Sequence, residues 1–145
     1  AKKYGCDEVI NYSKEDFAKK VMEITNGKGV SVVYDGVGKS TFDKSIECLK
    51  LRGTMVSFGN ASGALDPIVV SKSLQPKGIY FVRPAMMQYL ITREEIEEAS
   101  NMLFKQISSG KVKIEIYKKY KLEEVIQAHK DLEGRKIIGP AVIIP

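Results

Sequence analysis

Two glycine-rich segments of this 145-residue chain carry the residues best suited to hold a ligand. Gly36-Val37-Gly38 follows a strand expected at Val30–Asp35, and residues 58–63 (FGNASG) end a strand expected at residues 54–58. Glycine lets a backbone approach a ligand closely, and Asn60 and Ser62 add hydrogen-bond donors and acceptors. The favoured chemistry is therefore binding of a polar ligand at a strand end, although a simple strand-to-loop turn explains FGNASG equally well.

The first glycine segment does not complete a dinucleotide-binding fingerprint. Thr41 stands where the third glycine belongs, and no acidic residue ends a following strand at the required distance. A lone glycine pair after a strand indicates a tight turn. We still place Val37 near the path of a ligand, because ligands of open α/β sheets bind at the carboxyl edge where this turn lies.

The elements that must position both segments form a strand–helix–strand unit. Val30–Asp35 runs apolar without clean alternation, which is typical of a parallel strand buried on both faces. Ser40 is the expected cap of the helix, with Asp43 as its capping-box partner. The apolar stripe of this helix consists of Phe42, Ile46 and Leu49. A right-handed crossover between parallel strands then brings both glycine segments to the same edge.

The rest of the chain alternates between helices and strands. The further helices are expected at residues 1–4 (closed by Gly5), 13–26, 66–74, 92–110 and 123–133, and the further strands at residues 8–12, 79–83, 112–116 and 137–145. The long helix begins with a capping box, Thr92 and Glu95. Its expected buried face consists of Ile96, Ala99, Leu103 and Ile107. This alternation argues for an α/β fold with a doubly wound parallel sheet.

The net charge of +5 at pH 7 comes from lysines that are spread along the chain, as is typical of solvated helix faces. Only Lys118–Lys121 (KKYK) combines clustered charge with an aromatic ring, so we do not expect nucleic acid as a partner. No apolar run approaches the ~20 residues of a membrane-spanning helix, and no signal peptide is visible. We therefore expect a cytoplasmic protein with no membrane partner.

The cysteine and histidine content gives no support for a metal site. Cys6 and Cys48 lie far apart and match no CxxC pattern, so we expect two reduced, buried thiols. His129 is the only histidine, and there is no Cys/His cluster for zinc. Its spacing from Val125 and Leu132 on the expected helix favours a packing or surface role over catalysis.

Seven short motifs resemble a single family, in that family's order. They are GCDEVINY, ITNGKGV, VVYDGVG, VSFGNASG, FVRP, TREE and the final VIIP. The chain resembles the quinone oxidoreductases of the zeta-crystallin type, in the medium-chain dehydrogenase/reductase superfamily. The resemblance implies the C-terminal portion of a zinc-independent enzyme that reduces a quinone with NADPH. It also implies a homodimer that pairs through the strand from Ile79 to Arg83.

The same resemblance implies how the chain is divided. Residues 1–110 correspond to an NADP-binding Rossmann domain that lacks its first two strands in the order 3-2-1-4-5-6. Residues 111–145 correspond to a return segment that completes the GroES-like catalytic domain. In the family the glycine loop that grips the pyrophosphate lies upstream, so we expect the isolated chain to be inactive.

The resemblance further implies a cofactor site. Tyr12 would lie beside the adenosine and its 2′-phosphate, and the main chain of Phe81 and Val82 would meet the nicotinamide carboxamide. The complete expected set is Tyr12, Val37, Phe58, Gly59, Asn60, Ser62, Phe81, Val82, Arg83 and Arg135, with no catalytic side chain. From the residues alone, Tyr12 is also explained as an aromatic that covers a strand end, Arg83 as a surface or dimer residue, and Arg135 as a solvated charge.

Two other functions stay open. A medium-chain enoyl or alkenal reductase would share the same chemistry, because the cofactor carries it and the protein supplies orientation. A non-catalytic RNA-binding or structural crystallin-like module is the other alternative, and the charge of +5 leaves room for it.

Overall fold

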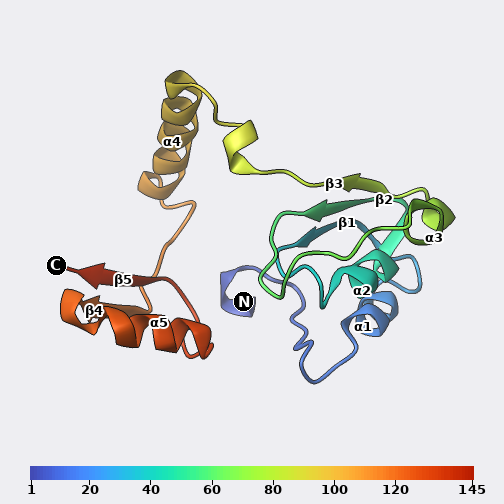
Figure 1. Ribbon diagram of the computed structural model, residues 1–145, viewed down its shortest axis with the longest axis horizontal. Coiled ribbons are helices and arrows are strands. Elements are labelled where there is room, and N and C mark those ends of the chain that lie inside the picture. Colours follow the sequence, from blue (N-terminus) through green and yellow to red (C-terminus); the bar gives the residue numbers. More distant parts are fainter. The chain divides into compact units, whose positions relative to one another are not determined.

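The computed structural model describes all residues from 1 to 145, and the chain divides into two compact units. The first unit is Ala1–Tyr89 and the second is Leu90–Pro145. Each unit is described by itself, with the element labels of Figure 1.

The first unit is built on a three-stranded parallel sheet in the order β1-β2-β3. The strands are β1 (Val30–Asp35), β2 (Leu49–Ser57) and β3 (Tyr80–Val82), and α2 (Phe42–Glu47) connects the first two. Asp35 lies opposite Ser57 in the register, so β1 and β2 end at the same edge. The expected strand–helix–strand unit and the α/β class are therefore confirmed, although β2 begins earlier than the predicted residue 54.

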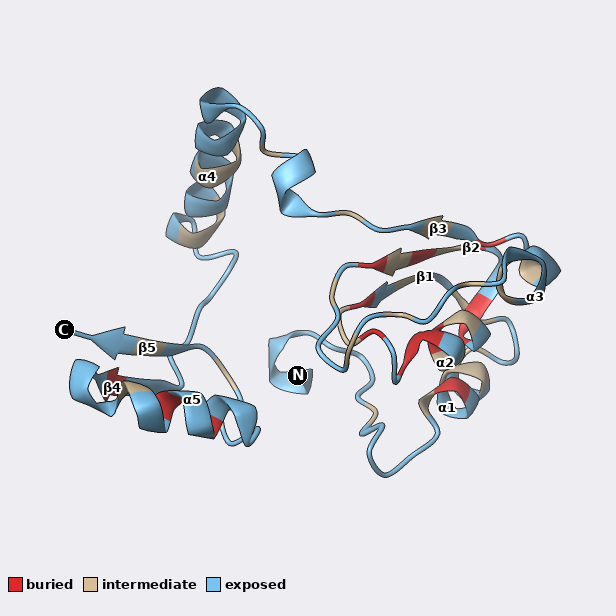
Figure 2. Cartoon of the chain, viewed as in Figure 1, coloured by how far each residue is buried: buried red, intermediate tan, exposed pale blue.

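The core of this unit lies on one face of the sheet. Its buried members are Phe42, Leu49, Met55 and Ile79, and buried positions gather on β2, α2 and α1 (Figure 2). Side chains alternate across a strand, and the alternate positions of β1 and β3 are exposed, with Tyr34 at 72% and Tyr80 at 65%. The prediction that β1 is buried on both faces was wrong, because within this chain only one face is covered.

The starts of two helices differ from those predicted. The helix α1 (Phe17–Ile24) begins later than the predicted residue 13, and Asp16 caps it, since its carboxylate accepts the N–H groups of Ala18 (3.1 Å) and Lys19 (3.2 Å). The cap position of α2 is Thr41 rather than Ser40, and no side chain caps that helix. Several polar residues precede each of these helices in the sequence, so the sequence alone does not say which one is the cap. For α1 the cap is Asp16, because its side chain reaches the free N–H groups of the first turn.

The remaining pieces of the first unit are short. They are α3 (Val70–Ser73) and the 3₁₀ helices η1 (Lys2–Tyr4), η2 (Gln75–Lys77) and η3 (Met86–Gln88). Gly5 ends η1 in the left-handed region with φ 98°, as expected. The helix predicted at residues 66–74 is thus reduced to four residues at its end.

No strand forms at residues 8–12, against the prediction. A strand needs a neighbour for its main-chain hydrogen bonds, and the sheet of this unit consists of β1, β2 and β3 alone.

The thiols also differ from the prediction of two buried groups, because Cys6 is exposed. Cys48 is buried, and burial together with the nearby Glu47 charge raises its pKa to about 11.

The second unit contains α4 (Arg93–Ser108), β4 (Lys118–Lys121), η4 (Leu122–Glu124), α5 (Val125–Glu133) and β5 (Ala141–Ile144). The two strands pair in parallel. The strand predicted at residues 112–116 is absent and β4 follows it instead, because pairing with β5 begins only at Lys118. The last strand is confined to Ala141–Ile144, since residues 137–140 lie outside that pairing.

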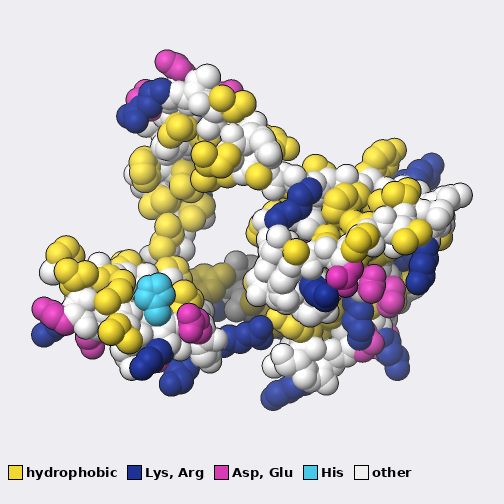
Figure 3. All heavy atoms as spheres, viewed as in Figure 1, with side chains coloured by type: hydrophobic (Ala, Val, Ile, Leu, Met, Phe, Trp, Pro, Cys, Tyr) yellow, Lys and Arg dark blue, Asp and Glu magenta, His cyan; other side chains and the backbone are white.

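The predicted capping box of α4 is confirmed, with Glu95 N–H donating to Thr92 Oγ1 (3.2 Å) and Thr92 N–H donating to the Glu95 carboxylate (2.9 Å). The predicted buried face is not, because Ile96 and Leu103 are 41% and 53% exposed. Hydrophobic side chains accordingly crowd the visible surface of α4 (Figure 3). None of the helices combines the length and the apolar character needed to cross a bilayer.

Asp131 on α5 joins that helix to β4. Its buried carboxylate accepts the Nζ of Lys118 (3.0 Å), the hydroxyl of Tyr120 (2.8 Å) and the Nε2 of Gln127 (2.8 Å). These hydrogen bonds, led by that of Lys118, lower the pKa of Asp131 to about 2.

Candidate functional site

The two glycine segments predicted from the sequence meet at the carboxyl edge of β1 and β2. We call residues 36–40 the first loop and residues 58–63 the second loop. The N–H and the hydroxyl of Ser62 both donate to the carbonyl of Val37, at 2.7 Å and 2.8 Å. The N–H of Ala61 donates to the carbonyl of Gly36 (3.3 Å), and the N–H of Ser40 donates to Ser62 Oγ (3.0 Å). The loops therefore form one connected structure.

The close approach of the loops requires glycine at two positions. A Cβ on Gly59 would overlap the carbonyl oxygen of Gly36. Gly38 has φ +90°, and a Cβ there would lie 2.8 Å from the carbonyl oxygen of Gly63. Only glycine adopts this conformation readily and leaves the space free.

Asp35 is the residue of this edge that sequence reasoning missed. Its side chain is 5% exposed and accepts the N–H groups of Val37 (2.8 Å) and Gly38 (3.0 Å). It also accepts the hydroxyls of Thr41 (2.8 Å) and Ser45 (2.8 Å). The available signal was an aspartate at a strand end, followed by a glycine turn and by hydroxyl residues six and ten positions later.

The electrostatics of Asp35 follow from these contacts. Burial would raise its pKa, but the hydrogen bonds from Gly38, Thr41, Ser45 and Val37 outweigh burial, so that the pKa lies below the ordinary value. The group is therefore an ionised, buried carboxylate that is held by neutral donors.

Tyr12 and Val37 lie on one open groove of about 300 Å³ beside β1. Tyr34 and Asp35 contribute to the same wall. The ring of Tyr12 meets that of Phe17 edge to face, with 6.3 Å between centroids, and remains 46% exposed. The structure thus brings these two predicted site residues together on a surface that a planar group could cover.

The second loop presents main-chain groups rather than the serine side chain. The hydroxyl of Ser62 both donates and accepts within the protein, so its role is to join the loops. Phe58 is 55% exposed, and its ring covers Gly36, where a Cβ would lie 3.0 Å from a ring atom. The N–H groups of Gly59 and Asn60 donate no hydrogen bond within the chain, and both are free to bind a ligand.

The predicted residues of β3 divide between core and edge. Phe81 packs edge to face on Phe42, with 6.1 Å between centroids, and belongs to the border of the core. Val82 lies on the exposed face at 38%. Arg83 donates from Nη1 to the carbonyl of Ser57 (2.6 Å), which ties the end of β3 to the end of β2.

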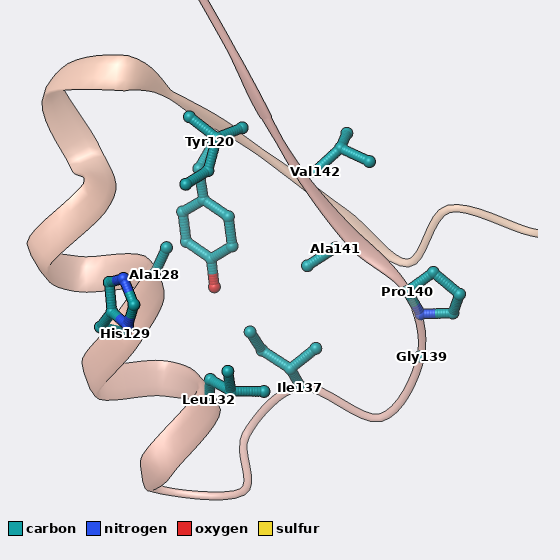
Figure 4. A pocket seen from close by; sticks show the side chains of 10 residues that line it. Tyr120, Ala128, His129, Leu132, Ile137, Gly139, Pro140, Ala141 and Val142 are labelled. Carbon is teal, nitrogen blue, oxygen red and sulfur yellow. The ribbon is translucent and has the colours of Figure 1, made fainter. Parts of the chain in front are cut away.

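Arg135 belongs to the second unit, whereas the other nine predicted residues belong to the first. It follows α5 in the left-handed region with φ 54°, and its N–H donates to the carbonyl of Leu132 (3.1 Å). His129 lines an apolar pocket of about 320 Å³ in the same unit. Tyr120, Leu132 and Ile137 point into this space between α5 and β5 (Figure 4). The Tyr120 hydroxyl already donates to Asp131 (2.8 Å), and the other side chains that line the pocket beside His129 are apolar.

The two loops and Tyr12 at the sheet edge are suited to binding an extended polar ligand. Two free N–H groups, a cradle that a Cβ would fill and an exposed tyrosine fit a dinucleotide. No group of three or more His, Cys, Asp or Glu side chains comes together to hold a metal ion.

The parallel sheet and the joined loops at its carboxyl edge are typical of α/β proteins, a class that binds ligands at that edge. Comparison with known proteins makes the assignment specific. The chain belongs to the zinc-binding dehydrogenase family, whose model matches residues 4–143.

Individual relatives cover the whole chain. It is 46% identical over 146 residues to a 2-haloacrylate reductase of Burkholderia sp, covering 100% of this chain and 44% of that protein. It is 45% identical over 147 residues to quinone oxidoreductase 1 of Escherichia coli strain K12, covering 100% of this chain and 45% of that protein. The resemblance to quinone oxidoreductases drawn from the sequence motifs is confirmed.

A solved structure of Escherichia coli quinone oxidoreductase complexed with NADPH matches with a TM-score of 0.90 at 45% identity. The match covers 97% of this chain and 44% of that chain. The chain therefore spans less than half the length of these relatives.

Proposed function

We propose that this chain is the NADPH-binding portion of a zinc-independent quinone oxidoreductase. The observation that carries the proposal is the pair of joined glycine loops at the sheet edge, in a chain that matches an NADPH-complexed quinone oxidoreductase over 97% of its length. The intact protein would reduce a quinone, and this chain alone would be inactive as a reductase.

The residues that would hold NADPH are those expected from the sequence. Tyr12 would bind beside the adenosine, the main chain of Gly59 and Asn60 would donate to the cofactor, and Val37 would line its path. Phe58 and Ser62 would support the second loop, and Phe81, Val82, Arg83 and Arg135 complete the proposed set. NADPH supplies the hydride when it is bound, and the main-chain and side-chain groups of these residues would bind and orient it.

The proposed fold of the intact protein follows from the same relation. The strands β1, β2 and β3 would be strands four to six of a Rossmann domain formed by residues 1–110 and an upstream part. Residues 111–145 would complete a GroES-like catalytic domain. β3 is an edge strand with one free side, which supports a homodimer that pairs through the strand from Ile79 to Arg83.

Calorimetric titration with NADPH, and with NADH for comparison, tests the cofactor assignment. We expect NADPH to bind more tightly than NADH, and Tyr12→Ala to weaken NADPH binding by about tenfold through loss of stacking area. Tyr89→Ala is the matched control, because Tyr89 is 64% exposed and lies outside the proposed site. Equal binding of both nucleotides would contradict the NADPH assignment, and binding of neither would place the decisive contacts outside residues 1–145.

A second candidate is reduction of an activated carbon–carbon double bond. The 46% identity to a 2-haloacrylate reductase favours it, since that substrate class differs from a quinone. A fusion of this chain to the remaining part of each relative, assayed with NADPH on a quinone and on 2-chloroacrylate, tests whether this portion influences the choice. If both fusions keep the preference of the added part, substrate choice lies entirely outside this chain.

A further inference from the structure

We propose that Asp35 is a positioning residue whose carboxylate sets the shape of both glycine loops and, through them, the affinity for the dinucleotide. The effect on affinity rests on the proposed function, whereas the effect on the loops does not. Asp35 ends β1 and lies in the wall of the groove that holds Tyr12.

The carboxylate determines the first loop directly. Its Oδ1 accepts two successive N–H groups, those of Val37 (2.8 Å) and Gly38 (3.0 Å). Its Oδ2 accepts the hydroxyls of Thr41 (2.8 Å) and Ser45 (2.8 Å), at and within the start of α2. One side chain therefore fixes the turn and the beginning of the helix relative to each other.

The second loop depends on the same residue through main-chain atoms. The carbonyl of Asp35 accepts the N–H of Phe58 (2.9 Å). The two carbonyls of the turn held by the carboxylate accept the N–H groups of Ala61 (3.3 Å) and Ser62 (2.7 Å). A change in the turn is thus transmitted to the second loop, which carries the two free N–H groups.

The charge of Asp35 contributes to this role. All its hydrogen-bond donors are neutral, and hydrogen bonds to an ionised acceptor are roughly twice as strong as neutral ones. Asparagine has the same shape and keeps one acceptor oxygen, but it carries no charge. Asp35→Asn therefore weakens the hydrogen bonds from the Val37 and Gly38 N–H groups, while it changes side-chain packing little.

Amide hydrogen exchange of the 145-residue chain tests the effect on the loops. In Asp35→Asn we expect the amides of Val37 and Gly38, and also those of Ala61 and Ser62, to exchange about tenfold faster. The amide of Met55 in the core serves as the internal control, since a general loss of stability would speed its exchange too. Asp43→Asn is the matched variant, because Asp43 is an exposed carboxylate of α2.

The outcome in the second loop decides the proposal. Faster exchange confined to the first loop, or equal acceleration at Met55, would overturn it. Should Asp35→Asn fail to fold, Thr41→Val and Ser45→Ala each remove one hydroxyl donor from the carboxylate. They are expected to give the same pattern across both loops with a smaller change, about threefold.

Titration with NADPH separates this inference from the proposed function. If the wild-type chain binds NADPH, Asp35→Asn is expected to raise the Kd by about tenfold while Asp43→Asn leaves it unchanged. Unchanged affinity in Asp35→Asn would refute the effect on binding and leave the proposed function standing. If the wild-type chain binds no NADPH, the effect on affinity is refuted for this chain, and the exchange data alone decide the role of Asp35 in the loops.

Discussion

At the scale of single residues, buried polar groups divide by how many partners they have. Asp35 and Asp131 each accept several hydrogen bonds, and the pKa of both lies below the ordinary value. Ser57 has 1% of its surface exposed, and its hydroxyl has no hydrogen-bond partner. Removing a buried polar group that has partners should therefore lower the free energy of unfolding, whereas removing the unpaired Ser57 hydroxyl should raise it.

Asp131 makes the stability of the second unit dependent on pH. Its pKa falls from 3.8 to about 2 on folding, so the unfolded chain takes up the proton first as the pH drops. The contribution of Asp131 is complete above pH ~4 and is lost as the pH falls through about 2. Urea unfolding of Asp131→Asn between pH 2 and 7 should lack this dependence, whereas Glu133→Gln on the same helix should retain it. A wild-type curve that is flat below pH ~4 would contradict the assignment.

Removal of the Ser57 hydroxyl should stabilise the first unit. A buried hydroxyl without a partner costs about 1 to 3 kcal/mol, so we expect Ser57→Ala to raise the free energy of unfolding by about 1 kcal/mol. Ser45→Ala is the contrasting variant, because its hydroxyl donates to Asp35 (2.8 Å), and it should lower the same quantity. Denaturant unfolding measures both, and a loss of stability in Ser57→Ala would show that its hydroxyl has a partner.

At the scale of elements, the end of α2 is held by a lysine from a distant segment. Lys77 Nζ donates to the carbonyls of Glu47 (2.7 Å), Leu49 (2.7 Å) and Ile46 (3.2 Å). A cation at this position donates to carbonyls at the end of α2 and at the start of β2, and it opposes the negative end of the helix dipole.

We expect Lys77→Met to destabilise the first unit by about 1.5 to 3 kcal/mol, because it leaves these carbonyls without their charged donor. Lys72→Met removes the same charge from an exposed position of α3 and should change the stability by less than about 0.5 kcal/mol. Thermal unfolding of both variants gives the comparison. Equal effects would mean that net charge, and not the three hydrogen bonds, matters.

The elements also separate what could be predicted from what could not. The β1–α2–β2 unit and the capping box of α4 depend on local patterns, and both were predicted. The strand at residues 8–12 required a neighbour that the chain does not provide, and β4 starts where β5 can pair with it. Asp35 was missed because its hydrogen-bond partners are a glycine turn and two hydroxyl residues. In the sequence alone, such residues look like those of any surface loop.

At the scale of the whole molecule, the two units differ in how much apolar surface they bury. The cluster of buried hydrophobic residues lies entirely in the first unit. The buried apolar side chains of the second unit are Tyr120 and Ala128, and its sheet has two strands. A two-stranded sheet that packs on one short helix, with so little buried apolar surface, is expected to be less stable than a three-stranded sheet over an apolar core.

Unfolding of the chain should therefore not be a single two-state transition. We expect amides of β4 and α5 to lose protection at lower urea concentration than those of β2, as followed residue by residue by NMR. Substitution of Met55 by alanine should shift only the later transition, because Met55 is a buried member of the first unit. Coincident loss of all amides would contradict the separation.

The joining of the two glycine loops through main-chain atoms has a consequence for how such proteins diversify. The exposed side chains of Lys39 and Ala61 make no hydrogen bond between the loops, whereas a Cβ on Gly38 or Gly59 would disrupt the contact between them. Descendants of one ancestral sequence could thus exchange the groups displayed at this edge, one substitution at a time, without rebuilding the support beneath. Adaptation to a new ligand and preservation of the scaffold are then carried by different positions of the same short segments.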